Sequence, residues 1–215
     1  MKQRDVFLAS EADAWYQRNH RSTGIERTHP TSWVHRVPEI VDSLDEPITP
    51  KLLEIGAADG SQMRTVAAMC NVDCYGLEPS RLAVEAAKSK GSNVVEGTAD
   101  SLPFDSNTFD IVVFGFCLYI CDLNDYKTIT TEADRTLRAS GYLIIHDFYS
   151  PTPRTVPYAH ADGVVTTKMD FRELFSLRGY MCVEHSVRSH ETGLYTDDRD
   201  EWVMTSVLKK AHPPA

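Results

Sequence analysis

The sequence predicts an α/β fold, a doubly wound and mostly parallel sheet with helices on both faces. Residues 51–60 read as a short buried strand that runs into a turn with two glycines, and a helical pattern follows at 61–69. Apolar runs of strand length then alternate with helical patterns as far as residue 147, which is typical of parallel sheets. Two further strand patterns, at 180–187 and 201–208, come near the end of the chain. We therefore expect one domain.

The elements before the glycine turn are predicted to be helical. Residues 10–20 form the first predicted helix, because Ser10 is a favourable cap and Asp13 is an acidic residue at the third position after it. Residues 31–44 form the second, which ends before Pro47.

The elements after the glycine turn follow in a regular order. Strands are predicted at 72–77, 93–96, 109–114 and 141–147, and helices at 80–89 and 123–137. Residues 148–168 contain several prolines and are predicted to be a long connection, which precedes a short helix at 169–176.

Composition narrows the class of protein. The chain has 215 residues, 42% of them hydrophobic and 25% charged, and a formal net charge of −9. The negative charge disfavours nucleic acid and anionic membranes as partners. No apolar run is long enough to span a membrane and the first residues lack the apolar region of a secretory signal, so we expect a cytoplasmic protein. Nothing in the sequence indicates the oligomeric state.

The spacing of the cysteines does not indicate a metal site. Cys70 and Cys74, like Cys117 and Cys121, are four residues apart, which differs from the Cys-x-x-Cys spacing common in zinc sites. Both pairs lie in or beside apolar segments, so we expect free, buried thiols and no bound metal.

The glycine turn indicates the charge of its ligand. Its spacing is Glu54-x-Gly56-x-x-x-Gly60, not the Gly-x-Gly-x-x-Gly of dinucleotide-binding proteins. Asp59 would lie beside a pyrophosphate and repel it, and Glu54 adds a second negative charge. A cofactor with a cationic centre suits the turn better, and S-adenosylmethionine carries both a sulfonium and an ammonium group.

Two acidic residues follow later strands. Glu78 ends the second predicted strand, where an acidic residue can bind both hydroxyls of a ribose. Asp100 follows the third, where it can accept a hydrogen bond from an adenine amine, with Ala99 and Ser101 beside it.

Taken in order, these segments resemble the class I S-adenosylmethionine-dependent methyltransferases, in particular those that act on small molecules. The motifs that carry the resemblance are Glu54 to Gly60, Glu78, the Gly97 to Phe104 run with Asp100, Phe109 to Leu118, and Leu137 to Tyr142. The resemblance implies a Rossmann-like sheet of seven strands whose last strand is antiparallel. It also implies an enzyme that converts S-adenosyl-L-methionine to S-adenosyl-L-homocysteine.

The resemblance also implies roles in cofactor binding. Gly56, Ala57 and Gly60 bring backbone near the methionine part, Pro79 packs on the adenosine, and Phe114 and Gly115 offer carbonyls to the ammonium. Residues 1–49 form a helical lid, in which Tyr16 or Arg18 contacts the carboxylate of the methionine part. The alternative is that Tyr16 is a core aromatic residue and Arg18 a surface charge.

The acceptor side is predicted from the residues after the fifth strand. His146 has an unperturbed pKa that suits a base, Asp147 can orient it or bind the acceptor, and His160 is a second candidate base. Residues 148–168 are predicted to be a substrate loop that offers Tyr149, Arg154, Tyr158 and Lys168. Residues 50–147 would then form the cofactor-binding core, and 169–208 a helix with a strand hairpin.

Several functions are compatible with these residues. The last third of the chain resembles methyltransferases of polysaccharide and sugar metabolism, which favours a sugar-like acceptor oxygen, although nitrogen as the acceptor atom stays open. A non-catalytic S-adenosylmethionine-binding accessory protein is one alternative. An RNA or protein methyltransferase is another. Base methylation of nucleic acid is disfavoured because residues 114–117 lack an Asn-Pro-Pro-Tyr-like motif.

Overall fold

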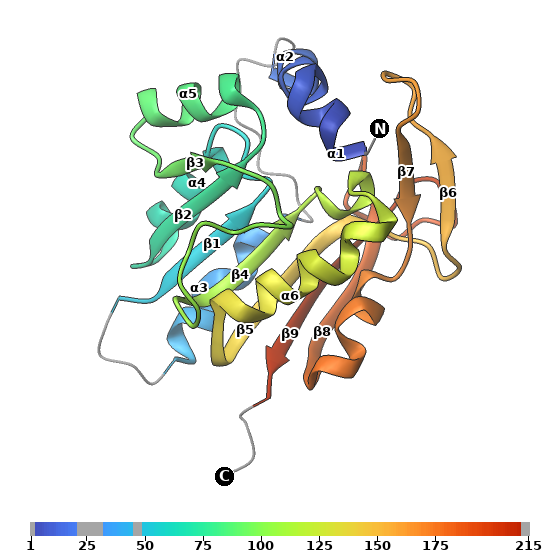
Figure 1. Cartoon of the computed structure of the whole chain (residues 1–215). Helices are drawn as coiled ribbons and strands as arrows, with labels where there is room; N and C mark the ends of the chain where they lie inside the picture. Colours follow the sequence, from blue (N-terminus) through green and yellow to red (C-terminus); the bar gives the residue numbers. More distant parts are fainter. Residues whose placement is uncertain (1–2, 21–31, 45–48, 212–215) are drawn as a thin grey trace.

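The computed structural model describes residues 3–20, 32–44 and 49–211 of the 215-residue chain. Its main sheet has seven strands in the order β3-β2-β1-β4-β5-β9-β8 (Figure 1). These strands are β1 (Lys51–Ile55), β2 (Asp73–Glu78), β3 (Val94–Glu96), β4 (Phe109–Gly115), β5 (Leu137–Phe148), β8 (Tyr180–Ser189) and β9 (Trp202–Lys210).

The strand directions confirm the predicted architecture. Strands β1 to β5 pair in parallel, and β1 lies between β2 and β4. Strand β9, the last in the chain, is antiparallel to both of its neighbours. The strand order reverses beside β1, and ligands of open α/β sheets bind at such a switch point, beyond the carboxyl ends of the strands.

Helices cover both faces of the sheet. On one face lie η2 (Trp33–Arg36), α3 (Val37–Asp42), α4 (Ser61–Met69) and α5 (Arg81–Ser89), and on the other α6 (Tyr126–Thr136) and η5 (Phe171–Arg178) (Figure 1). Successive strand residues point to opposite faces. Ile111 accordingly joins the cluster with Trp33, whereas Val112 joins the cluster with Phe175.

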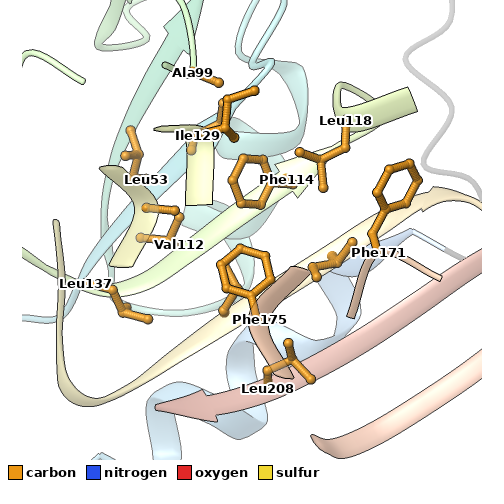
Figure 2. Close-up of a cluster of buried hydrophobic side chains, with 14 of the residues drawn as sticks. Leu53, Ala99, Val112, Phe114, Leu118, Ile129, Leu137, Phe171, Phe175 and Leu208 are labelled. Carbon is orange, nitrogen blue, oxygen red and sulfur yellow. The ribbon is translucent and has the colours of Figure 1, made fainter. Parts of the chain in front are cut away.

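The core on the α6 face is built around aromatic rings. Phe114, from β4, has its ring centroid 6.2 Å from that of Phe175, and both side chains are fully buried (Figure 2). Burial of a side chain of this size stabilises the fold by roughly 1.5–3 kcal/mol. Since β4 is fixed in this way, the backbone that follows it is held at the edge of the sheet.

The N-terminal helix differs from the prediction. It begins at Gln3 and runs through α1 (Gln3–Val6), the π-helical turn η1 (Phe7–Glu11) and α2 (Ala12–His20), so Ser10 lies inside it and caps nothing. The reason is tertiary, because the buried Gln3 side chain donates to the Ile120 carbonyl, at 2.5 Å, and to the Val165 carbonyl, at 2.8 Å. The predicted start of the second helix, Thr31, lies outside the described residues.

The segment 148–168 is more ordered than the sequence indicates. It contains a two-stranded hairpin of β6 (Arg154–Pro157) and β7 (Val165–Lys168). Pro157 ends β6 and is tolerated there because a two-stranded sheet consists of edge strands. None of the described helices is long and apolar enough to cross a membrane.

Candidate functional site

Two neighbouring cavities open beyond the carboxyl ends of β1, β2 and β4. The first, here called the Asp100 cavity, is lined by Asp100, Leu77 and Ala99 among others. The second, the Glu78 cavity, is lined by Glu78 and by residues from the N-terminal helix and from the loop after β4. The two cavities share the lining residues Phe7, Gly56, Pro79, Cys117 and Ile120. Because they share walls, one elongated ligand can occupy both.

The two glycines of the turn have different surroundings. Gly56 has a φ of +83°, and a Cβ there would lie 2.9 Å from the Cβ of Cys117 and 3.2 Å from the Gly115 carbonyl oxygen, so only glycine fits between these walls. Gly60 has a φ of +72° and packs against Ser92 instead. It lines neither cavity, and neither does the buried Ala57.

Glu78 is held with its carboxylate at the Glu78 cavity. One oxygen accepts from the backbone N–H of Ala58 and the other from that of Ser80, both at 2.9 Å. Burial raises the pKa of this carboxyl to about 7, against the lowering effect of the two backbone hydrogen bonds. Each oxygen keeps a further lone pair. The carboxylate can therefore accept two more hydrogen bonds from a ligand.

Glu54 carries an unsatisfied buried oxygen. Its side chain, on β1, is 3% exposed, and its Oε2 has no hydrogen-bond partner. Burial, together with the charges of the nearby Glu78 and Asp59, raises its pKa to about 8. The absence of a side chain on Gly115 makes room for it, since a Cβ there would lie 3.2 Å from Glu54 Oε1. An orphaned carboxylate oxygen beside two more acidic residues favours a cationic ligand.

Asp59 has a structural role. Lys90 donates to one of its carboxylate oxygens at 2.5 Å, and the N–H of Ser61 to the other at 3.2 Å. Its side chain is buried and lines neither cavity. The charge that the sequence placed at the turn is therefore neutralised in part by Lys90.

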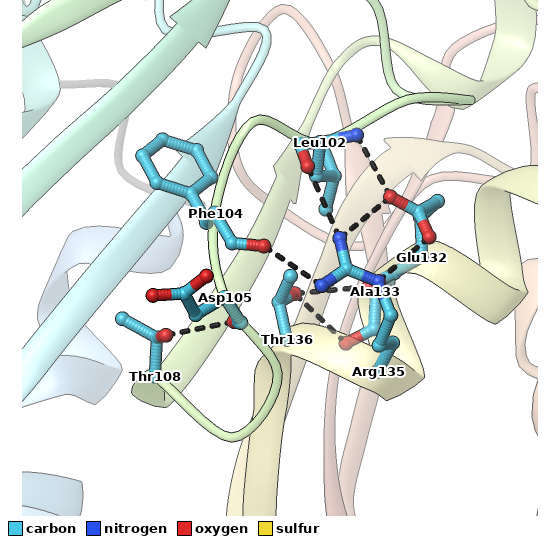
Figure 3. Close-up of polar contacts among 8 residues, drawn as sticks. All are labelled: Leu102, Phe104, Asp105, Thr108, Glu132, Ala133, Arg135 and Thr136. Carbon is cyan, nitrogen blue, oxygen red and sulfur yellow. Dashed lines mark hydrogen bonds and ion pairs between the residues drawn. The ribbon is translucent and has the colours of Figure 1, made fainter.

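Asp100 lies on a braced loop after β3. The guanidinium of Arg135 donates to the carbonyls of Leu102, at 3.1 Å, and Phe104, at 2.7 Å, and pairs with Glu132, which accepts from the Leu102 N–H (Figure 3). The Asp100 carboxylate is paired with Arg4 of the N-terminal helix. Ala99 and Pro79 line the Asp100 cavity with it, whereas Ser101 is exposed and lines neither cavity.

The N-terminal helix closes the cavities from outside. Phe7, Ala12 and Trp15 line the Glu78 cavity, and Arg4 and Phe7 line the Asp100 cavity. Asp13 fastens the helix to α5, because its Oδ1 accepts from Ser80 Oγ at 2.6 Å and from the Leu82 N–H at 3.1 Å.

Tyr16 and Arg18, the two lid residues predicted to contact the cofactor, lie in different surroundings. Tyr16 lies near the charges of Asp59 and Glu78, and burial and Asp59 raise its pKa. Arg18 turns away from both cavities, pairs with Glu11 and donates to Tyr158 Oη at 3.0 Å. The sequence predicts a helical lid but does not identify Arg4, Phe7 and Trp15 as the lid residues that line the cavities. Their signal was the spacing along one helix face, visible once the helix is known to begin at Gln3.

The three predicted bases either form hydrogen bonds within the protein or lie exposed on its surface. The Asp147 carboxylate is fully buried and accepts from three backbone N–H groups, those of Leu118, Tyr119 and Phe148, at 2.8, 3.2 and 2.7 Å. His146 is 3% exposed and its Nδ1 lies 2.8 Å from Thr205 Oγ1. His160 is exposed on the turn between β6 and β7. None of these three lines either cavity.

The four predicted acceptor-binding residues also lie outside both cavities. Tyr149 packs against β8 and β9, with its ring 6.0 Å from that of Trp202. Arg154 forms an ion pair with Asp200, and Lys168 donates to the Asp200 carbonyl at 2.6 Å. Tyr158 donates to Glu11 at 2.9 Å, which joins the β6–β7 hairpin to the N-terminal helix.

Sequence comparison finds related proteins over the central part of the chain. Residues 53–145 match the family described as methyltransferase domain. The uncharacterized methyltransferase YcgJ of Bacillus subtilis is 31% identical over 109 residues, which are 47% of this chain and 42% of that protein. A demethylmenaquinone methyltransferase of Anoxybacillus flavithermus is 34% identical over 104 residues, 45% of this chain and 43% of that protein. The chain thus spans less than half the length of these curated relatives.

Structure comparison extends the likeness to nearly the whole chain. The Burkholderia thailandensis 1,6-didemethyltoxoflavin-N1-methyltransferase, with 1,6-didemethyltoxoflavin and S-adenosylhomocysteine bound, aligns with a TM-score of 0.72 and 14% identity over 98% of this chain and 91% of that one. A putative methyltransferase of Haloferax volcanii, in complex with the Trm112 methyltransferase activator, aligns with a TM-score of 0.69 and 19% identity over 97% and 99%. At such identities the likeness is one of fold.

Proposed function

We propose that this chain, which belongs to the class I S-adenosylmethionine-dependent methyltransferase family, binds S-adenosylmethionine across the two cavities and transfers its methyl group to a small-molecule acceptor. The observation that carries the proposal is the buried Glu78 carboxylate, which reaches the cavities from the end of β2 with acceptor capacity to spare. The orphaned Glu54 oxygen supports it, because Glu54, although it lines neither cavity itself, lies beside Gly115, which lines the Glu78 cavity.

The residues present fit the parts of this cofactor. Leu77, Pro79 and Ile129 give the Asp100 cavity apolar walls for an adenine ring, and Asp100 can accept from its amine. Glu78 can accept from both ribose hydroxyls. Glu54 and the Gly115 carbonyl lie on the side where the ammonium would be held. The bound cofactor supplies a methyl group on a positively charged sulfur, and the protein supplies position and a negative environment.

Calorimetric titration with S-adenosylmethionine and with S-adenosylhomocysteine tests the proposal. We expect micromolar binding of both ligands to well-folded protein. Transfer of a labelled methyl group to an acceptor from a small-molecule extract would then establish the activity. Absence of binding by folded protein at several pH values between 6 and 9 would contradict the proposal.

Glu54→Gln is expected to weaken S-adenosylmethionine binding about tenfold at pH 9, where Glu54 is ionised, because it removes a buried negative charge near the proposed position of the cationic part of the cofactor. It should also stabilise the ligand-free protein at high pH. The folded-state pKa of about 8 lies above the ordinary 4.5, so the folded state favours the protonated carboxyl, and stability falls as pH rises from about 4.5 to about 8. Urea unfolding at pH 5 and pH 9 measures this, and the variant should gain up to about 5 kcal/mol at pH 9 and little at pH 5.

The same ionisation links binding to pH. Wild-type affinity for S-adenosylmethionine should rise from pH 6 to pH 9, as Glu54 and Glu78 lose their protons, and Glu54→Gln should flatten part of this rise. Glu85→Gln, on the exposed side of α5, is the matched control and should change neither stability nor affinity. An unchanged pH profile in Glu54→Gln would refute the assigned position of the cationic group.

Asp13→Ala is expected to speed the release of bound cofactor about fivefold, because it removes the two hydrogen bonds that fasten the N-terminal helix to α5. Stopped-flow displacement of S-adenosylmethionine by excess S-adenosylhomocysteine, followed by tryptophan fluorescence, measures the rate. Glu85→Ala, at the same exposed position of α5, is the control for this variant. A release rate equal to that of the wild type would show that this end of the helix does not gate the site.

A small-molecule acceptor agrees with the acidic charge of the chain and with the acceptors named for two similar proteins, demethylmenaquinone and 1,6-didemethyltoxoflavin. The sugar-like oxygen expected from the sequence stays a prediction that the same acceptor screen tests. The few polar groups that line the Glu78 cavity favour an aromatic acceptor over a sugar. Cytoplasmic location also stays a prediction.

A second candidate function is methylation of RNA or protein with the help of an activating partner. The observation that favours it is the fold likeness to a methyltransferase that forms a complex with a Trm112 activator. Labelled methyl transfer to total RNA and to total protein, each compared with the small-molecule extract, separates the two functions. A cofactor-binding accessory protein would bind S-adenosylmethionine and label none of the three.

A further inference from the structure

The Glu78 cavity is bounded by four aromatic residues from two elements. Phe7 and Trp15 come from the N-terminal helix, and Phe116 and Tyr119 from the loop after β4. Trp15 and Tyr119 are joined by a side-chain hydrogen bond. Among the described residues that line this cavity, none is a lysine, arginine or histidine. The surface beside the Glu78 carboxylate is therefore aromatic and apolar.

Phe116 is held in an unusual conformation. Its φ of +50° lies in the left-handed region, which is costly for a phenylalanine. Its ring lies edge-on to His146, with centroids 4.6 Å apart, and 5.2 Å from the ring of Phe148. The strained backbone and the packed ring together fix this side chain toward the cavity. A fixed flat surface is what an aromatic ligand requires for stacking.

The aromatic surface is supported from behind. Phe148 lies 5.0 Å from Tyr119 and 5.4 Å from His190, measured between ring centroids, and Lys168 Nζ lies 4.8 Å from the Phe148 ring. His146 in turn is fixed by Thr205 on β9. The predicted base His146 and the predicted acceptor residue Lys168 thus act on the cavity through rings that they hold in place.

The cavity also lacks a spare base among its described lining residues. Its one carboxylate is Glu78, whose acceptor capacity the ribose hydroxyls would use. The Asp147 carboxylate accepts hydrogen bonds from backbone N–H groups, and His146 packs behind the Phe116 ring. An alcohol oxygen must lose a proton during methylation, and among the described residues that line the cavity no histidine and no carboxylate other than Glu78 is present to take it. A ring nitrogen with a free lone pair needs no base.

We propose that the aromatic wall of the Glu78 cavity, on the side of Phe116 and beside the bound cofactor, receives a flat, uncharged nitrogen heteroaromatic acceptor, which stacks on Phe116 and is methylated on a ring nitrogen. This inference rests on the proposed function. The nitrogen lone pair forms the new N–C bond, the C–S bond breaks, and its electron pair passes to sulfur, which becomes a neutral thioether. The ring gains one positive charge, or loses a proton from another nitrogen to water. The Glu78 carboxylate, which lines the same cavity, stabilises the positive charge on the methylated ring.

Matched probes test the acceptor class. Lumazine, isoquinoline and xanthine serve as flat nitrogen rings, 2-naphthol as a flat ring with only an oxygen, and methyl glucoside as a sugar. Binding is measured by calorimetry with S-adenosylhomocysteine present, and transfer by mass spectrometry with S-adenosylmethionine. We expect at least one nitrogen ring to bind and to gain a methyl group on nitrogen, and methyl glucoside to do neither.

Phe116→Leu tests the stacking surface. It should weaken binding of the nitrogen ring about tenfold, as loss of an aromatic pair predicts, and more than it weakens binding of S-adenosylhomocysteine measured on the same variant. Phe116→Tyr keeps the ring and should restore binding. Phe104→Leu is the matched control, because it removes a half-buried ring that packs on Phe109 at the start of β4, away from the cavities.

The outcomes separate the two claims. Binding of S-adenosylhomocysteine with no binding of any flat nitrogen ring overturns the acceptor class and leaves the proposed function standing. Methylation of 2-naphthol or methyl glucoside, with none on a nitrogen ring, overturns it as well. No binding of S-adenosylhomocysteine at all overturns the proposed function itself.

Discussion

Glu78→Ala is expected to weaken S-adenosylmethionine binding by at least about 100-fold. The variant loses two charge-assisted hydrogen bonds to the ribose, each worth about 1.5 kcal/mol, and a factor of 100 corresponds to about 2.8 kcal/mol. Calorimetry at pH 8 measures the loss, since Glu78 is then mostly ionised, with its pKa of about 7. Glu78→Gln keeps one acceptor oxygen, so its affinity for S-adenosylmethionine should lie between those of Glu78→Ala and the wild type.

The neighbouring strand provides a matched control. Glu96 is the register partner of Glu78 on β3, at the same height in the sheet, but its side chain is half exposed and lines neither cavity. Glu96→Ala should bind S-adenosylmethionine as the wild type does. Thermal unfolding of both variants shows whether the loss of the Ala58 and Ser80 hydrogen bonds has also affected the fold. Normal cofactor binding by a folded Glu78→Ala protein would refute the site.

The cofactor half of the site could be predicted because chain order determines it. A residue at the end of a parallel strand reaches the carboxyl edge of the sheet whatever the other contacts are. Glu78 and Gly56 needed only the strand ends to be recognised, and the structure brings both to the cavities. Gly60 and Ser101 show the limit of this reasoning, because they stand in the same motifs and lie outside both cavities.

The acceptor half could not be predicted in the same way. Phe116 has no sequence signal for its left-handed backbone, which depends on packing against His146 and Phe148. Trp15 reaches the cavity only because Gln3 and Asp13 fix the N-terminal helix over it. The contacts of Gln3 and Asp13 join residues more than 60 positions apart in the chain, and those of Phe116 join residues at least 30 apart, so a local pattern contains no information on them.

Asp147 shows why a strand-end carboxylate is ambiguous in sequence. The Asp147 side chain joins the end of β5 to the loop that follows β4. Its carboxylate accepts from the N–H groups of Leu118 and Tyr119 in that loop, as well as from that of Phe148. Asp147→Ala would remove the acceptor of three N–H groups, of which that of Leu118 is buried and those of Tyr119 and Phe148 are partly buried. We expect it to lower the free energy of unfolding by about 3 kcal/mol or more and to abolish cofactor binding, because Cys117 and Tyr119 would lose their positions in the cavity walls.

Asp147→Asn distinguishes this structural role from that of a base. The amide oxygen can still accept from Leu118 and Tyr119, but the NH2 group would face the Phe148 N–H, so stability should fall by about 1–2 kcal/mol. Burial raises the wild-type pKa from 3.8 to about 7, so the folded state favours the protonated carboxyl and Asp147 reduces stability as pH rises through this range. Denaturant unfolding from pH 4 to pH 8 should therefore show a smaller slope in Asp147→Asn. A base that acts only in methyl transfer would give the opposite pattern, namely unchanged unfolding and cofactor affinity with a transfer rate reduced at least about 100-fold, because the amide cannot take up a proton.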